Sequence, residues 1–203
     1  MMDRVNAFAR RVPTWVVYGL GVVPLAFLVW GAVAGDLGVD PVKAIEKRLG
    51  LLGLQFLLAS LAITPLRRVG LNLIRFRRAL GLLAFGYVSL HLVAWVWLDM
   101  GLRWSEMAAD LVKRPYVILG MIGFVALVPL AATSTNYAIR RMGPVGWRRL
   151  HRLAYLAVLA GALHLVLLSK VWTAQVLVYA GLAVLLVALR LLPPLAPRPR
   201  TAA

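Results

Sequence analysis

Charged residues in this chain occur in clusters, and long apolar stretches without a charge separate the clusters. A helix needs about 20 apolar residues, within a range of roughly 17 to 25, to cross the hydrocarbon core of a bilayer. Six stretches supply that length once a flanking residue or two is included, and the pattern therefore predicts an all-α integral membrane protein with six transmembrane helices. The stretches lie between Arg11 and Asp36, Arg48 and Arg67, Arg78 and Asp99, Arg114 and Arg140, Arg152 and Lys170, and Lys170 and Arg190.

Two of these stretches carry signals that affect their boundaries. The second, from Leu49 to Leu66, ends at a Thr64-Pro65 pair, which we expect to stop or kink the helix near the membrane surface. The first, from Val12 to Ala34, is longer than the 7–15-residue apolar core of a cleavable signal peptide, so we predict that it is retained as a transmembrane helix. We assign residues 1–192 to one six-helix transmembrane domain and the proline-rich residues 193–203 to a disordered cytoplasmic tail.

Two segments between the predicted spans show short helical patterns. In residues 35–50, Asp40-Pro41 is a helix start signal, and apolar residues follow it at helical spacing. In residues 98–114, Ser105 can cap a short helix that carries Met107 and Leu111. Both segments are predicted to form short amphipathic helices on the outer surface, either as interfacial anchors or as landing sites for an outer partner.

The distribution of charge predicts the orientation. The chain has 23 Lys and Arg against 7 Asp and Glu, which gives a formal net charge of +16. If the N-terminus is inside, the inner segments (residues 1–12, 67–78, 135–152 and 190–203) hold 16 of the 23 basic residues. The positive-inside rule therefore predicts that both termini are cytoplasmic. A basic face beside anionic lipid accounts for the charge without nucleic acid, although the arginines near 75–78 and 140–152 could also converge on a phosphate or an acidic protein surface.

Composition narrows the choice of cofactor. Hydrophobic residues make up 62% of the chain, and there is no cysteine. The absence of cysteine excludes a disulfide framework, a thiolate-bound iron–sulfur cluster and a covalently attached c-type haem. The sequence also has no glycine-rich dinucleotide fingerprint, so electrons from NAD(P)H would need a separate protein.

Two of the three histidines lie deep within predicted spans. His91 is 13 residues past Arg78, which places it about 20 Å from the inner surface at 1.5 Å per residue. His164 is 12 residues past Arg152, which places it at about 18 Å. Both spans run from inside to outside, so the two imidazoles are predicted to lie at one depth and to form a pair.

A paired imidazole at this depth needs a binding partner, because an ionisable group exposed to lipid is costly. No carboxylate lies within the predicted spans, which disfavours the alternative of a histidine-lined proton or metal-ion transporter or channel. Two imidazoles alone also leave a tetrahedral zinc site short of ligands, whereas they satisfy a six-coordinate haem iron. We therefore predict a haem-binding helical bundle, and small residues near the pair, such as Ala157, Gly161 and Gly86, leave room for a flat macrocycle.

Four segments of the chain resemble the MsrQ (YedZ) family, the haem-binding membrane subunits of the periplasmic protein-methionine-sulfoxide reductase system. The family belongs to the ferric-reductase-like transmembrane group. The segments are "RFRRALGLLAFGYVSLHL" from Arg75, "TSTNYAIRRMGPVGWRRLHRLAYLAVLAGALHL" from Thr133, "ITPLRR" from Ile63 and the text from Asp36 to Lys43.

The resemblance implies a b-type haem, FMN as a second cofactor and a bacterial inner membrane. It also implies that electrons pass from the quinone pool to a periplasmic molybdopterin subunit that reduces methionine sulfoxide, with a cytoplasmic flavin reductase as a further candidate donor. The roles of axial ligands transfer to His91 and His164. Larger relatives carry two histidines on each of two helices and bind two haems, whereas this chain has two on one predicted span and one on the other.

The third histidine, His151, lies at the inner edge of its predicted span, where no second histidine faces it. Several basic residues share its depth. We hypothesise that an inner site for an electron donor or a flavin is bordered by Arg77, Arg78, Arg149, His151 and Arg152.

Overall fold

A computed structural model describes residues 2–191, and every regular element within that range is helical. The predicted disordered tail, residues 193–203, lies outside the described residues. The elements are α1 (Met2–Arg11), α2 (Thr14–Ala34), α3 (Pro41–Arg68), the 3-10 turn η1 (Ile74–Phe76), α4 (Arg77–Val93), the π-helical turn η2 (Ala94–Asp99), α5 (Trp104–Lys113), α6 (Pro115–Ala132), α7 (Asn136–Leu150), α8 (Leu153–Leu168) and α9 (Ala174–Leu191).

Five of the predicted spans are matched by helices that are long and apolar enough to cross a membrane. The sixth corresponds to a shorter apolar helix, Ala174–Arg190 within α9. The five are α2, α3, the continuous stretch Ile74–Asp99, α6, and the stretch Asn136–Leu168 formed by α7 and α8.

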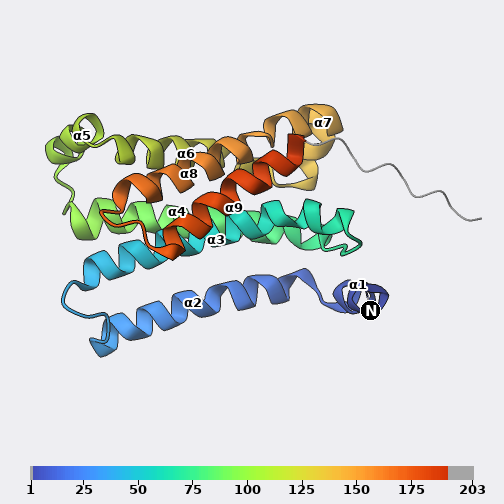
Figure 1. Cartoon of the computed structure of the whole chain (residues 1–203), viewed down its shortest axis with the longest axis horizontal. Coiled ribbons are helices and arrows are strands. Elements are labelled where there is room, and N and C mark those ends of the chain that lie inside the picture. The colour runs from blue at the N-terminus through green and yellow to red at the C-terminus, as the bar shows by residue number, and fades with distance from the viewer. Residues whose placement is uncertain (1, 192–203) are drawn as a thin grey trace, which may run out of the picture.

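The long helices run side by side, and their connections gather at two ends of the bundle (Figure 1). One end, which we call the basic end, holds α1, α7 and the connection from α3 to α4. The other, which we call the histidine end, holds α5 and the connection from α2 to α3. Within residues 2–191, the segments that the charge pattern assigns to one side of the membrane thus lie at one end of the molecule.

The boundaries of α3 differ from the prediction in two ways. The helix begins as expected, with the Asp40 carboxylate accepting a hydrogen bond of 3.0 Å from the backbone N–H of Lys43 and with Pro41 in the first helical position. It does not remain a separate surface helix, however, but continues without a break into the span. The helix does not stop at the Thr64-Pro65 pair either, because α3 runs to Arg68, two residues beyond the predicted end at Leu66.

An arginine on a neighbouring helix explains why Pro65 does not end α3. A proline inside a helix leaves the carbonyl four residues earlier without its N–H donor, and here that carbonyl belongs to Leu61. The Arg190 guanidinium of α9 donates a hydrogen bond of 2.9 Å to the Leu61 carbonyl. Arg68 in turn donates a bond of 2.7 Å to the carbonyl of Leu189, so α3 and α9 are joined reciprocally near their C-terminal ends.

Two further local features differ from the sequence expectations. The short amphipathic helix α5 exists and buries Met107, but it begins at Trp104, so Ser105 lies within its first turn and does not cap it.

Within the inner segment 135–152, residues Asn136–Leu150 form the helix α7, which the sequence pattern did not predict. Its start is capped by Thr135, and it is interrupted at Gly143, whose φ of 70° is outside the helical region.

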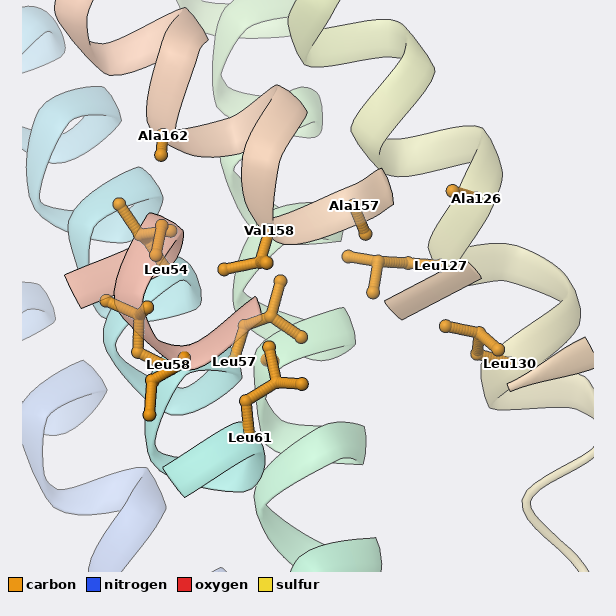
Figure 2. Packing of buried hydrophobic residues seen from close by; sticks show 13 residues of the cluster. Leu54, Leu57, Leu58, Leu61, Ala126, Leu127, Leu130, Ala157, Val158 and Ala162 are labelled. Atoms are coloured by element: carbon orange, nitrogen blue, oxygen red, sulfur yellow. The ribbon is translucent and has the colours of Figure 1, made fainter. Parts of the chain in front are cut away.

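A core of leucines and small residues fills the middle of the bundle (Figure 2). Leu57 of α3, Leu127 of α6 and Val158 of α8 meet there, and Val158 is fully buried. Alanines on α6 and α8 let these helices approach closely, which is how helices gain packing energy in lipid. The core thereby fixes the distance between the helices that carry the two deep histidines.

We expect Leu61→Ala, at a position that is 2% exposed, to destabilise the folded protein by about 2 kcal/mol, near the low end of the range for leucine truncations. The low end applies because the truncation removes packing contacts within lipid-like surroundings and little burial from water. Leu185→Ala is the matched control, since Leu185 is 52% exposed and faces the surroundings. Thermal unfolding in one detergent measures the difference, and equal melting temperatures for the two variants would contradict the packing shown here.

Candidate functional site

His91 near the C-terminal end of α4 and His164 near the C-terminal end of α8 lie next to each other. Their ring centroids are 6.1 Å apart, and the ring planes make an angle of 78°. The predicted pairing of the two rings is therefore confirmed. Their role as iron ligands remains a prediction.

Each ring is oriented by a hydrogen bond to the backbone of another helix. His91 Nδ1 lies 2.9 Å from the Glu46 carbonyl oxygen, and His164 Nδ1 lies 2.6 Å from that of Tyr116. A carbonyl oxygen only accepts hydrogen bonds, so Nδ1 must carry the proton in both rings. Nε2, on the far side of each ring, then keeps its lone pair. A hydrogen bond of this kind at Nδ1 selects the tautomer whose Nε2 can bind a metal.

The helix pairs that make these bonds are also the most extensively packed ones. α4 lies along α3, and α8 lies along α6. Glu46 and Tyr116 both belong to the early part of a helix that starts with proline, Pro41 in α3 and Pro115 in α6. The proline start signals in the sequence thus determine where the two acceptor carbonyls lie along the bundle.

Two cavities lie against the histidine pair, and both rings line both cavities. Their empty space, including the part open to the surroundings, is about 530 and 730 Å³. The lining is mainly apolar. The residues shared by both cavities are Val88, His91, Gly120, Phe124, His164 and Leu168.

These features fit a metal macrocycle held between two imidazoles. Two metal–imidazole bonds of about 2 Å each, together with the size of the rings, place the two centroids roughly 6 Å apart. The observed separation of 6.1 Å meets this requirement. Within residues 2–191, no three His, Asp or Glu side chains gather as a metal site, so at the pair these side chains offer two imidazole ligands and no third one.

The structure places one carboxylate closer to the pair than the sequence predicted. Glu46 lines one of the two cavities, because α3 begins at Pro41 and carries this residue into the bundle. Its carboxylate is bound by Lys43, at 3.3 Å, and the same ammonium group binds Asp99 at 2.6 Å. Lys43 thus compensates both carboxylates and ties the start of α3 to the end of η2.

A third cavity opens near the basic end, with an empty space of about 1170 Å³ including its open part. Arg77, Arg78 and His151 line it, as does Arg75, so the structure brings three of the five residues predicted for an inner site together. The remaining two, Arg149 and Arg152, are exposed and are not among the residues that line the cavity. The other polar and aromatic lining residues are Ser60, Ser134, Phe85 and Trp147.

His151 uses its ring nitrogens differently from the deep pair. Its Nε2 lies 3.2 Å from the Thr133 hydroxyl, which already donates its proton to the Pro129 carbonyl at 2.6 Å. The hydroxyl oxygen must therefore accept from His151, so Nε2 is protonated. Trp147 stacks on the ring with centroids 3.8 Å apart. In this arrangement His151 forms a wall of the basic cavity and does not offer a free Nε2.

Only a thin layer of side chains separates the basic cavity from the histidine cavities. Leu57 and Leu127 line both the basic cavity and one of the histidine cavities. Phe85, on the basic side, stacks on Phe124, on the histidine side, with ring centroids 6.0 Å apart. The two regions are therefore neighbours along the bundle.

Comparison with known proteins places the chain in a family. Residues 48–162 match the family described as "Ferric reductase like transmembrane component". A protein of Brucella anthropi named "Protein-methionine-sulfoxide reductase heme-binding subunit MsrQ" is 44% identical over 181 residues, which cover 89% of this chain and 82% of that protein. Proteins of the same name from Brucella ovis and Brucella canis are each 42% identical, with the same coverage. The chain belongs to the MsrQ family.

The predicted resemblance to the MsrQ family is thus confirmed. Together with the apolar helices described above, membership of a transmembrane family identifies a multi-pass membrane protein. The segment that matches the ferric-reductase-like family includes His91 and His151 and ends two residues before His164. The longer match to the MsrQ relatives covers most of the chain.

Sequence reasoning missed the part of the site that the backbone provides. The carbonyls of Glu46 and Tyr116 leave no residue-type signature, because every residue has a carbonyl. Gly50 and Gly120, against which the two rings lie, were visible as glycines within apolar helices, and that signal could have been used. Gly86, which was predicted to leave room for a macrocycle, is exposed, with open space around it.

Proposed function

We propose that this chain binds one b-type haem through His91 and His164 and passes electrons across the bacterial inner membrane to a periplasmic molybdopterin methionine sulfoxide reductase. The observation that carries the proposal is the pair of imidazoles, 6.1 Å apart, each with Nδ1 bonded to a backbone carbonyl. The names of the relatives, which describe a haem-binding subunit of a protein-methionine-sulfoxide reductase, support both the cofactor and the partner.

Different residues of the chain have different roles in this proposal. The Nε2 atoms of His91 and His164 would hold the iron, and the apolar walls of the two cavities would exclude water from the macrocycle. A haem with two imidazole ligands supplies one-electron redox chemistry. With both imidazoles bound, the iron would have no position left for a substrate, so in this proposal the chemistry on sulfur belongs to the partner and electron transfer to this chain.

The electrons arrive, in this proposal, at the basic cavity. We place it on the cytoplasmic side, with six spans and both termini inside, because the basic segments gather at that end of the bundle. The donor is a membrane quinol or a flavin, either FMN in the cavity or a cytoplasmic flavin reductase that docks there. Arg77, Arg78 and His151 would face this donor, while Arg149 and Arg152 contribute only surface charge.

We expect His91→Ala and His164→Ala each to lower the haem content of the purified protein by roughly tenfold or more, because each removes an axial ligand. His151→Ala is the matched control and should retain the Soret band, since its Nε2 is bonded to Thr133. Absorbance spectra and haem-to-protein ratios measure the effect. A normal spectrum in both variants of the deep pair would end the assignment of these ligands, whereas a wild type without a Soret band would favour the alternative of a histidine-lined transport path.

We expect the combined variant Arg77→Gln, Arg78→Gln and His151→Ala to keep its Soret band but to be reduced more slowly by reduced FMN, by roughly tenfold, because electrostatic guidance of this anionic donor is lost. The charge-matched control is Arg140→Gln with Arg141→Gln, two exposed arginines of α7 outside the cavity lining. Anaerobic stopped-flow reduction by a quinol analogue and by reduced FMN measures the rates. If the rates equal those of the control and the flavin content is unchanged, the proposal that the donor binds in this cavity would be wrong.

We expect reporter fusions to place both termini in the cytoplasm and the segment between α8 and α9 in the periplasm. Alkaline phosphatase, which is active only outside the cytoplasm, should therefore be active when inserted after Lys170 and inactive when fused after Arg190. Activity at the second position would mean that α9 does not cross the membrane, and would leave five spans in place of six.

A further inference from the structure

Two glycines lie directly against the rings of the deep histidine pair. A Cβ atom built on Gly50 of α3 would be 3.2 Å from both Cε1 and Nδ1 of His91. One built on Gly120 of α6 would be 3.0 Å from Nδ1 and 3.2 Å from Cε1 of His164. In both cases the three nearest atoms all belong to the imidazole ring. Distances of 3.0 to 3.4 Å are tighter than nine in ten real Cβ contacts, so an added methyl group would require the ring to shift by a few tenths of an ångström.

The same local arrangement is used twice. Gly50 follows Glu46 by four residues, and Gly120 follows Tyr116 by four residues. Residues four apart lie one above the other on the same face of a helix. Each helix therefore presents a carbonyl that accepts the Nδ1–H bond and, one turn later, a glycine without a side chain next to which the ring lies. We call this pair of features a histidine seat.

We propose that Gly50 and Gly120 are positioning residues, which set the orientation of His91 and His164 toward the metal by keeping the two histidine seats open. The inference rests on the proposed haem site and names residues that act through its ligands. A methyl group on either glycine would push the ring outward by a few tenths of an ångström, lengthen the Nδ1–carbonyl bond and turn Nε2 away from its present direction.

Other glycines show that this is distinct from ordinary helix packing. Gly21 of α2 allows the close approach of Leu83, whose Cδ1 would be 2.4 Å from an added Cβ, and neither residue lines a histidine cavity. Gly86 of α4 has nothing within 4 Å of an added Cβ. The chain thus contains a glycine that only packs helices and a glycine that tolerates a methyl group, and both serve as controls.

The first experiment compares Gly50→Ala and Gly120→Ala with Gly86→Ala and Gly21→Ala in purified protein. We expect the first two to lower haem retention by about 10-fold to 100-fold, as losses around metal ligands do, or to retain haem with altered low-spin electron paramagnetic resonance signals. Gly86→Ala should match the wild type. Gly21→Ala should lower thermal stability while leaving the spectrum of the bound haem unchanged. The inference would be overturned if Gly50→Ala and Gly120→Ala had the same haem content and the same spectra as Gly86→Ala.

The second experiment is a double-mutant cycle that does not depend on haem. In a His91→Ala background the ring is absent, so adding Gly50→Ala should change the melting temperature no more than adding Gly86→Ala does. The corresponding cycle pairs Gly120→Ala with His164→Ala. An equal loss of stability with and without the ring would show that these glycines serve only helix packing. If the wild type bound no haem, the proposed function would fail, yet this cycle would still decide whether the glycines seat the rings.

Discussion

The hydrogen bond from a histidine Nδ1–H to a backbone carbonyl of a neighbouring helix is the interaction on which the site depends. Inside an apolar bundle an imidazole N–H has few acceptors, and an unpaired polar group there is costly. His91 and His164 meet this requirement with the carbonyls of Glu46 and Tyr116. The bond does more than satisfy a donor, because it fixes the tautomer and the direction of the ring. Each neutral imidazole is thereby left with one available nitrogen, which is the state that a metal macrocycle requires.

These bonds can form only if the helices keep their distance and register. The leucine and alanine core that joins α3, α6 and α8 keeps the distance (Figure 2). The register of α3 depends on the start at Pro41 and on the far end, where Pro65 would otherwise leave the Leu61 carbonyl unsatisfied. Arg190 supplies the missing donor and ties α9 to the same helix. A polar contact near the basic end thus helps to hold in place the helix that orients His91 at the histidine end.

Sequence patterns predicted the features that follow from periodicity and charge. A constant rise per residue was enough to place His91 and His164 at one depth, and proline start signals located the beginning of α3. The same patterns could not show that α3 continues through Thr64-Pro65, because the compensating donor, Arg190, comes from a helix more than 120 residues later. They also left Glu46 in a surface segment, since nothing local distinguishes a short amphipathic helix from the first turns of a longer one. Among the five basic-end residues predicted for one site, Arg149 and Arg152 were grouped by depth alone, and depth does not determine which face of a helix a side chain occupies.

The two regions differ in chemistry in a way that favours one haem site and one donor site over two equivalent haem sites. The deep histidines have apolar surroundings and protonated Nδ1 atoms, so their Nε2 atoms are available. In His151 the other ring nitrogen carries the proton, because Nε2 donates a hydrogen bond to the Thr133 hydroxyl. Three arginines line the same cavity as His151. Arginine side chains are permanently charged and disfavour a metal cation, but they stabilise an anionic donor such as a flavin phosphate. The stacked Phe85 and Phe124 rings and the shared Leu57 and Leu127 lie between the two regions. The basic cavity and the histidine pair are therefore neighbours along the bundle with different chemistry, since arginines line the first and apolar side chains surround the second.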